Sequence, residues 1–330
     1  MSTAGHGPNI GHGYVKYIII SETGQELEPI IFPSQVAHAS GRVAGALLDA
    51  QTVAIGGMYF WTGDDTGLAP NAQTILSQER LSDPAFIPAL IASAVQRFGH
   101  LNGSSSGMCV SGLPATWADD REKCRQLGRL LRIGAPDMYE RITVIAEPLG
   151  LAYAALLDNN GQVVGDSALA RSRIGVVDLG HLTVDRSELY KLAPAKTAMD
   201  TYQLGTARPL SQIRARISAH VDRELTLIET DTAIRAGVVR VAGQDTPLPR
   251  GWDQPLLESG QAIRDRLVEA WGRGNQFEAI LLGGGGAEVP QITEAIRASF
   301  RHAIVVEKPQ TAIARGYARL ARRQTLAEQV

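Results

Sequence analysis

The feature that most constrains the fold is a junction at which an apolar strand runs directly into a glycine-containing turn. The uncharged run 174–177 predicts a buried strand, with Asp178 at its end and Gly180 in the following turn. Gly180 lets the backbone approach a ligand closely and Thr183 adds a hydroxyl, so this turn suits a phosphate group or a metal ion. An ordinary β-hairpin is built in the same way, so one such turn leaves both interpretations open.

Strands and helices alternate along the whole chain, which indicates the α/β class. Apolar runs and alternation predict one or two strands in 52–63, and a hairpin within 233–248. They also predict strands at 14–21, 27–34, 107–114, 141–146, 174–177, 186–192, 277–283 and 303–309. Helical spacing of apolar residues predicts helices at 83–98, 117–132, 148–157, 206–219, 222–236, 253–274, 290–300 and 311–327. Residues 4–8, AGHGP, predict only a poor strand, because glycine weakens a strand and proline removes a ladder donor.

Charge and composition exclude several kinds of protein. The 330 residues are enough for two domains, and the net charge of −2 favours neither direct nucleic-acid binding nor an anionic membrane surface. Cys109 and Cys124 lack metal-ligand spacing and are expected to be free thiols. No apolar stretch is long enough to span a membrane, and the first residues lack signal-peptide features, so we expect a cytoplasmic protein.

Four junctions of the same kind recur along the chain, at residues 9–16, 146–150, 178–185 and 281–289. In the first, Gly11 and Gly13 free the backbone for phosphate contact, and Lys16 supplies a positive charge. In the second, Pro148 suits a first helical turn and leaves Glu147 at the end of a strand. The last has four consecutive glycines before a helix, a place where a ligand meets no side chain.

In order and spacing these junctions resemble the actin, sugar-kinase and heat-shock ATPase superfamily, most of all the ParM-type actin-like filament proteins that segregate bacterial plasmids. Further similar stretches are 30–37, 59–66, 110–117 and 307–321. The resemblance implies an actin-like, ribonuclease H-like fold with a nucleotide cleft between two domains. Domain I is expected at 1–165, with 309–330 returning to it, and domain II at 166–308. The chain has no room for the peptide-binding domain of the large chaperones.

The same resemblance implies a role for each matching residue, with ATP or ADP and Mg²⁺ as cofactors. Asp178 would hold the water shell of the metal, and Glu147 would orient the attacking water. The residues expected to contact the nucleotide are Asn9, Gly11, His12, Gly13, Lys16, Gly180, His181, Thr183, Gly283, Gly284 and Gly285. The backbone of Gly283, Gly284 and Gly285 would lie against the α-phosphate and the adenosine.

Several of these residues also have a purely structural interpretation. Lys16 could be an exposed strand residue, Glu147 a charge at a helix start, and the histidines exposed loop residues. The four glycines could form a plain flexible turn, and the arginine-rich end a membrane-lying helix. We favour phosphate contact for Lys16, the catalytic role for Glu147, and a solvated terminal helix packed on the first domain.

The sequence departs from the family pattern at the first turn, where Asn9 replaces an aspartate. An amide has no charge, so it would hold a metal only weakly through water, and hydrolysis would be slow. Leu182 also replaces a residue that is commonly small or polar in the family.

The resemblance implies three kinds of function. The first is a filament of identical subunits, controlled by ATP hydrolysis and connected to DNA through an adaptor protein, without direct contact to nucleic acid or membrane. The second is a small-molecule phosphotransferase, although no acceptor motif is evident. The third is a nucleotide-binding scaffold filament with little hydrolysis, which Asn9 motivates. The base-contacting region, 206–236, has no motif that distinguishes ATP from GTP.

Overall fold

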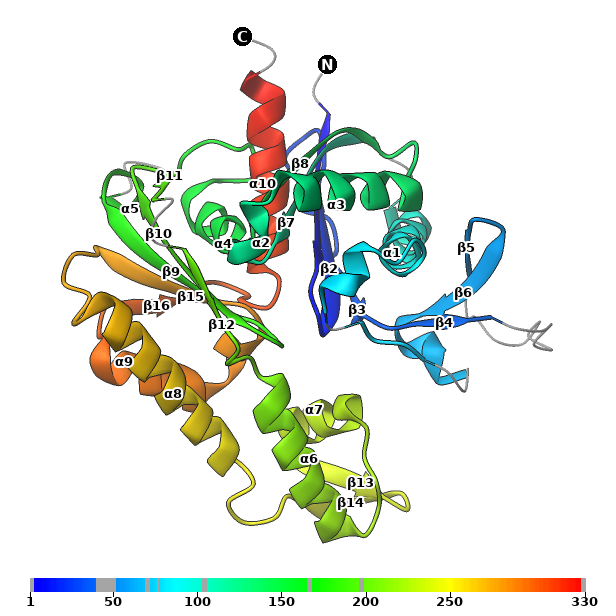
Figure 1. Ribbon diagram of the computed structural model, residues 1–330, viewed down its shortest axis with the longest axis vertical. Coiled ribbons are helices and arrows are strands. Elements are labelled where there is room, and N and C mark those ends of the chain that lie inside the picture. The colour runs from blue at the N-terminus through cyan, green and yellow to red at the C-terminus, as the bar shows by residue number, and fades with distance from the viewer. Residues whose placement is uncertain are drawn as a thin grey trace.

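Two sheets, each containing an antiparallel hairpin and parallel strands, form the centre of the molecule (Figure 1). The computed structural model describes residues 3–39, 52–68, 72–75, 77–102, 106–164, 168–195 and 199–327. The chain builds the first sheet, then the second, and returns to the first through its last helix, so both termini lie at the same end. The predicted boundary at 165/166 falls outside the described residues.

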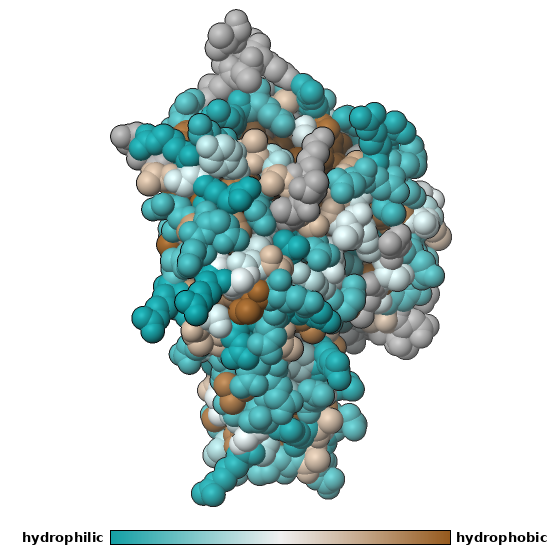
Figure 2. Space-filling view, turned by 60° about the vertical axis from the view of Figure 1, so that its left-hand side comes forward, coloured by the Kyte–Doolittle hydropathy of each residue, from teal (hydrophilic) through white to brown (hydrophobic). Residues whose placement is uncertain are grey.

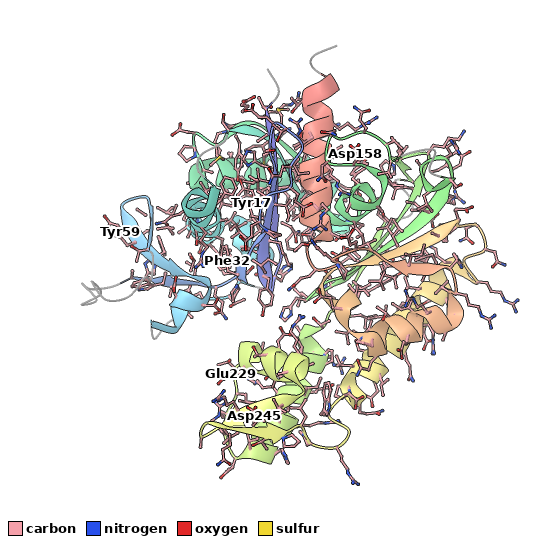
Figure 3. All side chains as sticks on the ribbon, turned by 180° about the vertical axis from the view of Figure 1, so that it is seen from behind. Tyr17, Phe32, Tyr59, Asp158, Glu229 and Asp245 are labelled. Atoms are coloured by element: carbon pink, nitrogen blue, oxygen red, sulfur yellow. The ribbon has the colours of Figure 1, made fainter. Side chains whose placement is uncertain are left out.

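The first sheet has the strand order β3-β2-β1-β7-β8. Its strands are β1 (Ala4–Ile10), β2 (Tyr14–Ile20), β3 (Ile30–Pro33), β7 (Gly107–Leu113) and β8 (Tyr139–Ala146). Alternate residues of β2 face opposite sides: Tyr17 packs in the core with α1 (Phe86–Asn102) and α3 (Arg121–Gly134), whereas Ile18 packs against α10 (Ala312–Ala327). Tyr17 and Phe32 mark the sheet in the reverse view (Figure 3).

The second sheet has the order β11-β10-β9-β15-β16, with β12 also paired to β10. Its strands are β9 (Arg173–Leu179), β10 (Val184–Tyr190), β11 (Ala193–Pro194), β12 (Asp200–Tyr202), β15 (Ala279–Gly283) and β16 (Ala303–Val305). One face packs on α8 (Gln254–Trp271) and α9 (Pro290–Ser299). The other packs on α4 (Glu147–Leu156) and α10, so these two helices lie between the sheets.

Two smaller units extend from the sheets. The first contains β4 (Val36–His38), β5 (Val53–Ile55), β6 (Met58–Thr62) and the short 3₁₀ helices η1 (Gly63–Leu68) and η2 (Gln78–Leu81). The second contains α6 (Ala207–Val221), α7 (Leu227–Ala236), β13 (Val238–Val241) and β14 (Gln244–Pro247). Figure 3 shows Tyr59 on the first unit, and Glu229 and Asp245 on the second. Short helices α2 (Ala115–Ala118), α5 (Ala168–Arg171) and η4 (Gly285–Glu288) complete the described elements.

The prediction of a poor strand at 4–8 is wrong, because β1 covers these residues and is buried along its whole length. The physical reason is the last helix, α10, whose backbone lies in direct contact with the backbone of β1. A Cβ on Gly5 would lie 2.4 Å from the Ala318 carbonyl oxygen, and one on Gly7 would lie 2.0 Å from that of Ala314. The glycines therefore allow this contact, and a loss of strand propensity is the cost.

Helix α10 makes an equally close contact with α4. A Cβ on Gly316 would lie 1.7 Å from the Gly150 carbonyl oxygen. The terminal helix is packed on the first sheet, as predicted, but the prediction that it is solvated is wrong, because most of its described residues are buried between the sheets. No helix in the described part of the chain combines the length and the apolar character needed to cross a membrane. Much of the surface in Figure 2 is hydrophilic, with hydrophobic residues scattered over it.

We predict that Gly316→Ala lowers the free energy of unfolding by at least about 2 kcal/mol, because α10 and α4 must separate to admit the methyl group. Chemical denaturation of the protein without nucleotide measures the change. The control is Gly99→Ala on α1, where an added Cβ meets nothing within 4 Å and should stabilise the helix by about 0.5–1 kcal/mol. Equal effects at the two glycines would contradict the packing argument.

Candidate functional site

A cavity of about 250 Å³ lies between the two hairpins, and most of the predicted site residues line it. These are Asn9, Gly11, His12, Gly13, Lys16, Glu147, Asp178, Gly180, His181, Thr183, Gly284 and Gly285. Gly283 does not line it. A Cβ at Gly283 would lie 2.3 Å from the Leu151 side chain, so this glycine serves the packing of β15 on α4.

The two turns occupy equivalent places in their sheets. In β1–β2, Asn9 pairs with Lys16, and in β9–β10, Asp178 pairs with Asp185, each pair enclosing the same number of residues. Both segments are therefore hairpins and also line the cavity, so the two interpretations of the sequence are compatible. The turns approach each other closely, since a Cβ on Gly13 would lie 3.0 Å from the imidazole of His181.

Each turn presents one histidine to the cavity, and both are half-buried, so the alternative interpretation as exposed loop histidines is wrong. Burial lowers the pKa of His12 to about 3, and the charge of Arg80 adds to the effect. Burial, followed by the charge of Lys16, also lowers the pKa of His181. Both imidazoles are therefore neutral near pH 7 and can each donate one hydrogen bond.

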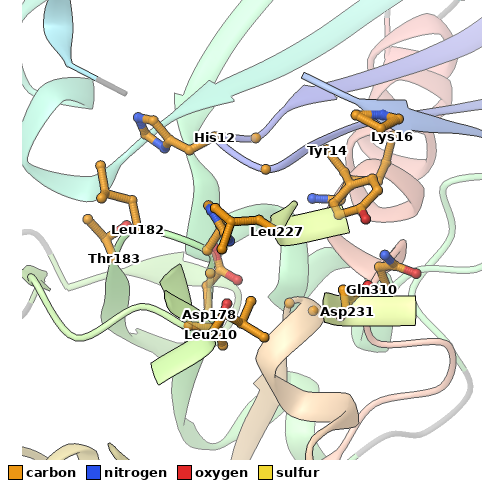
Figure 4. Close-up of a pocket in the computed structure, with 18 of the residues that line it drawn as sticks. His12, Tyr14, Lys16, Asp178, Leu182, Thr183, Leu210, Leu227, Asp231 and Gln310 are labelled. Atoms are coloured by element: carbon orange, nitrogen blue, oxygen red, sulfur yellow. The ribbon is translucent and has the colours of Figure 1, made fainter. Parts of the chain in front are cut away.

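Lys16 projects into the cavity from β2, so it is not an exposed strand residue (Figure 4). Its Nζ would lie 3.0 Å from a Cβ placed on Gly11, which means that the ammonium group rests against the first turn. Burial lowers the pKa of Lys16, and the carboxylates of Asp178 and Glu147 act in the opposite direction. The cavity thus has a basic side chain at one turn, close to two carboxylates.

Three carboxylates meet at the cavity, where Glu147 and Asp178 line it and Asp185 is buried beside them. One oxygen of each of Glu147, Asp178 and Asp185 lies within 4.8 Å of the others. Burial raises the pKa of Glu147 to about 8 and that of Asp178 to about 7, and repulsion within the cluster adds to both shifts. Oxygen ligands of this kind fit a hard divalent cation such as Mg²⁺.

Asn9 is buried beside Glu147 and donates a hydrogen bond from Nδ2 to its Oε1 over 3.3 Å. Glu147 begins α4, and Pro148 lies in the first turn, as the sequence predicts. The amide at position 9 is therefore a partner of the carboxylate, where an aspartate would repel it.

The sequence reasoning assigned no role to Asp185, which is fully buried. Asp185 accepts hydrogen bonds from the Thr183 hydroxyl (2.8 Å) and from the backbone N–H of Ala115 (3.0 Å), which joins the second hairpin to α2. Its position seven residues after Asp178, matching the spacing from Asn9 to Lys16, was the available signal.

The outer part of the cavity is lined by α6 and α7, in the region predicted to contact a base. Figure 4 shows Leu210, Leu227 and Asp231 there, with Tyr14 on the opposite wall. Asp231 pairs with Arg235 over 3.0 Å. Burial, followed by the charge of Asp231, raises the pKa of Tyr14 to about 12. Tyr14 was given no role although it lies within the first junction, 9–16, and Asp231 was missed because its segment has no motif.

Gly284 has a φ of +81°, and a Cβ there would lie 2.2 Å from Asp178 Oδ1. The glycine is therefore required for the close approach of the β15 turn to the carboxylate, which a plain flexible turn would not need. This turn closes the floor of the cavity beside Asp178.

No protein-family model matches the chain, and no curated protein matches it in sequence. Solved structures do match over its whole length. The archaeal actin homologue Ta0583 has 18% identity and a TM-score of 0.73, covering 98% of this chain and 100% of that chain. A ParM filament subunit from Clostridium botulinum has 15% identity and a TM-score of 0.71, with 98% and 100% covered.

ParM from Bacillus thuringiensis, solved with AMPPNP, has 15% identity and a TM-score of 0.67, with 100% of both chains covered. At these identities the comparison establishes the fold. The chain has the actin-like two-domain α/β fold close to that of ParM, which confirms the fold expected from its sequence.

We predict that Glu147→Gln stabilises the nucleotide-free protein at pH 8 by on the order of 1–3 kcal/mol, and much less at pH 5. With its pKa raised to about 8, folded Glu147 keeps a proton that the unfolded chain releases above its ordinary pKa near 4.5. Stability therefore falls as pH rises through this window, and glutamine removes that loss.

Urea denaturation at both pH values, without Mg²⁺, measures the difference. The control is Glu140→Gln, an exposed residue of β8, which should change stability little at either pH. A gain for Glu147→Gln that is the same at pH 5 and pH 8 would contradict the prediction.

Proposed function

We propose that this chain, with its actin-like fold, binds ATP with Mg²⁺ in the cleft and assembles into filaments under the control of ATP hydrolysis. The observation that supports this most directly is the pair of equivalent hairpins that face one cavity, with Lys16 on one and Asp178 on the other. Such a cavity suits an elongated anion that carries a divalent cation.

In this proposal the backbone of each turn holds phosphate oxygens, and Lys16 neutralises part of their charge. Asp178, with its neighbours in the carboxylate cluster, would hold Mg²⁺, which when bound supplies further neutralisation of the phosphate charge. Glu147 would orient the water for in-line attack on the terminal phosphoryl group. Its raised pKa means that a nearby cation is needed to keep it ionised at neutral pH.

The outer part of the cavity would take the nucleoside. Apolar side chains that include Leu210, Leu227 and Ile234 suit the faces of a base, and the carboxylate of Asp231 suits sugar hydroxyls. The backbone of Gly284 and Gly285 would lie along the phosphate side of the ligand.

Filament formation rests on the fold relatives, among which the Clostridium botulinum ParM was solved as a 15-stranded filament. ATP would connect the two domains and favour a closed, polymerising form, and hydrolysis would weaken the filament. We further propose a cytoplasmic role in plasmid segregation, with DNA reached through an adaptor, because a net charge of −2 does not favour direct DNA binding.

Asn9 supports a second candidate, a scaffold filament that hydrolyses ATP slowly. Its buried amide lies within hydrogen-bond distance of Glu147 and adds no negative charge to the metal site. Metal binding at this side of the cavity would then rest on Asp178 and Glu147.

We predict that the protein sediments as filaments with ATP and Mg²⁺, and much less with ADP or without nucleotide. High-speed sedimentation and electron microscopy, with phosphate release recorded in the same samples, test this. Lys16→Met should remove ATP-dependent sedimentation, because it removes a cation that contacts phosphate, whereas Lys123→Met on α3, which does not line the cavity, is the control. Protein that stays in the supernatant under every condition would reject the filament and favour a phosphotransferase.

We predict that Asn9→Asp increases the rate of phosphate release about tenfold at saturating Mg²⁺, because the added carboxylate binds the water shell of the metal. Without Mg²⁺ the same variant should be less stable than the wild type, since the new charge faces Glu147. Single-turnover phosphate release and urea denaturation measure the two effects. An unchanged rate would show that Asn9 does not limit turnover.

A further inference from the structure

Arg80, at the end of the short helix η2, is a buried cation without an acidic partner. Its relative exposure is 4%, and among the residues that the structure describes no carboxylate lies within 4.0 Å of the guanidinium. The guanidinium lies 5.8 Å from the centre of the Phe86 ring. Burial lowers the pKa of Arg80 to about 10, so the charge is poorly compensated inside the protein.

The single hydrogen bond of this guanidinium in the described structure goes to the first hairpin. Nη2 of Arg80 donates to the carbonyl oxygen of Ile10 over 2.8 Å, directly before the turn at 11–13. A guanidinium has five N–H donors, so most of them remain available to a ligand. Arg80 is therefore held by the turn that would bind phosphate and has unused donors beside it.

A second, small cavity borders Arg80 and shares two lining residues with the larger one. It has a volume of about 10 Å³, and its lining includes Arg80, His12, Trp117 and Glu147. His12 and Glu147 also line the large cavity, so the small one lies directly behind these two side chains. The charge of Arg80 acts on both of them, lowering the pKa of His12 and opposing the rise in that of Glu147.

We propose that Arg80 is a second cationic ligand of the terminal phosphate of ATP, acting beside Lys16. This inference rests on the proposed function. Two side chains from different parts of the first domain would then hold the same phosphate: Lys16 from β2, and Arg80 from the segment that leads out of the small β4–β6 unit. ADP lacks this phosphate, so Arg80 distinguishes triphosphate from diphosphate and leaves binding of the rest of the nucleotide unchanged.

The test compares affinities for AMPPNP and ADP by isothermal titration in the presence of Mg²⁺. For Arg80→Met we expect the preference for AMPPNP over ADP to fall at least tenfold, with the affinity for ADP within threefold of the wild type. Arg80→Lys keeps a charge but not the planar fork, and should lose at least threefold of the preference. If the methionine variant does not fold, the lysine variant decides by the same ratio.

Arg97→Met is the matched control, and should leave the preference within twofold of the wild type. Arg97 also packs on an aromatic ring, 4.8 Å from the centre of Phe32, but it pairs with Asp65 and lines neither cavity. If the role of Arg80 is purely structural, Arg80→Met will weaken the binding of AMPPNP and of ADP equally. That result would overturn this inference but not the proposed function. A wild-type protein that binds neither nucleotide would overturn the proposed function itself.

Discussion

Backbone contact between α10 and the two elements on either side of it is the constraint on which the rest of the structure depends. Main chains meet here at distances that a methyl group would prevent. The glycines that allow this contact are Gly7 on β1, and Gly150 and Gly316 between α4 and α10. Asn9 lies near the end of β1, and Glu147 begins α4. The same packing that joins the sheets therefore also sets the distance between these two cavity residues.

The sequence was sufficient to predict the class, the element order and most of the cavity lining, because those depend on local patterns. Strand β1 was misjudged because its glycines are needed for contact with a helix more than 300 positions later in the chain. Local strand propensity contains no information about such a contact. Arg80 and Asp231 were missed for a related reason, since they come from segments without a motif and only folding brings Asp231 to the large cavity and Arg80 to the small one. Gly283 was included with Gly284 and Gly285 but does not line the cavity, because position within a glycine run does not reveal which residue faces it.

Burial of charged groups in the cleft destabilises the protein when no ligand is bound. Burial raises the pKa of Glu147 and Asp178 and lowers those of Lys16 and Arg80, so every one of these groups is less easily charged than in water. Opposite charges brought by a ligand would reverse these shifts. The cleft is therefore organised for a bound state, and the two cores around the sheets supply the stability that it lacks.

The paired hairpins have the same backbone and the same register but opposite charge. Where the first has an amide and an ammonium group, Asn9 and Lys16, the second has two carboxylates, Asp178 and Asp185. The equivalent pairing of the two hairpins is thus broken by their side chains, and the cleft has Lys16 on one hairpin and Asp178 on the other. A ligand with an anionic end and a bound cation would bind in only one of the two orientations that the backbone alone allows, so charge selects the direction in which the ligand lies.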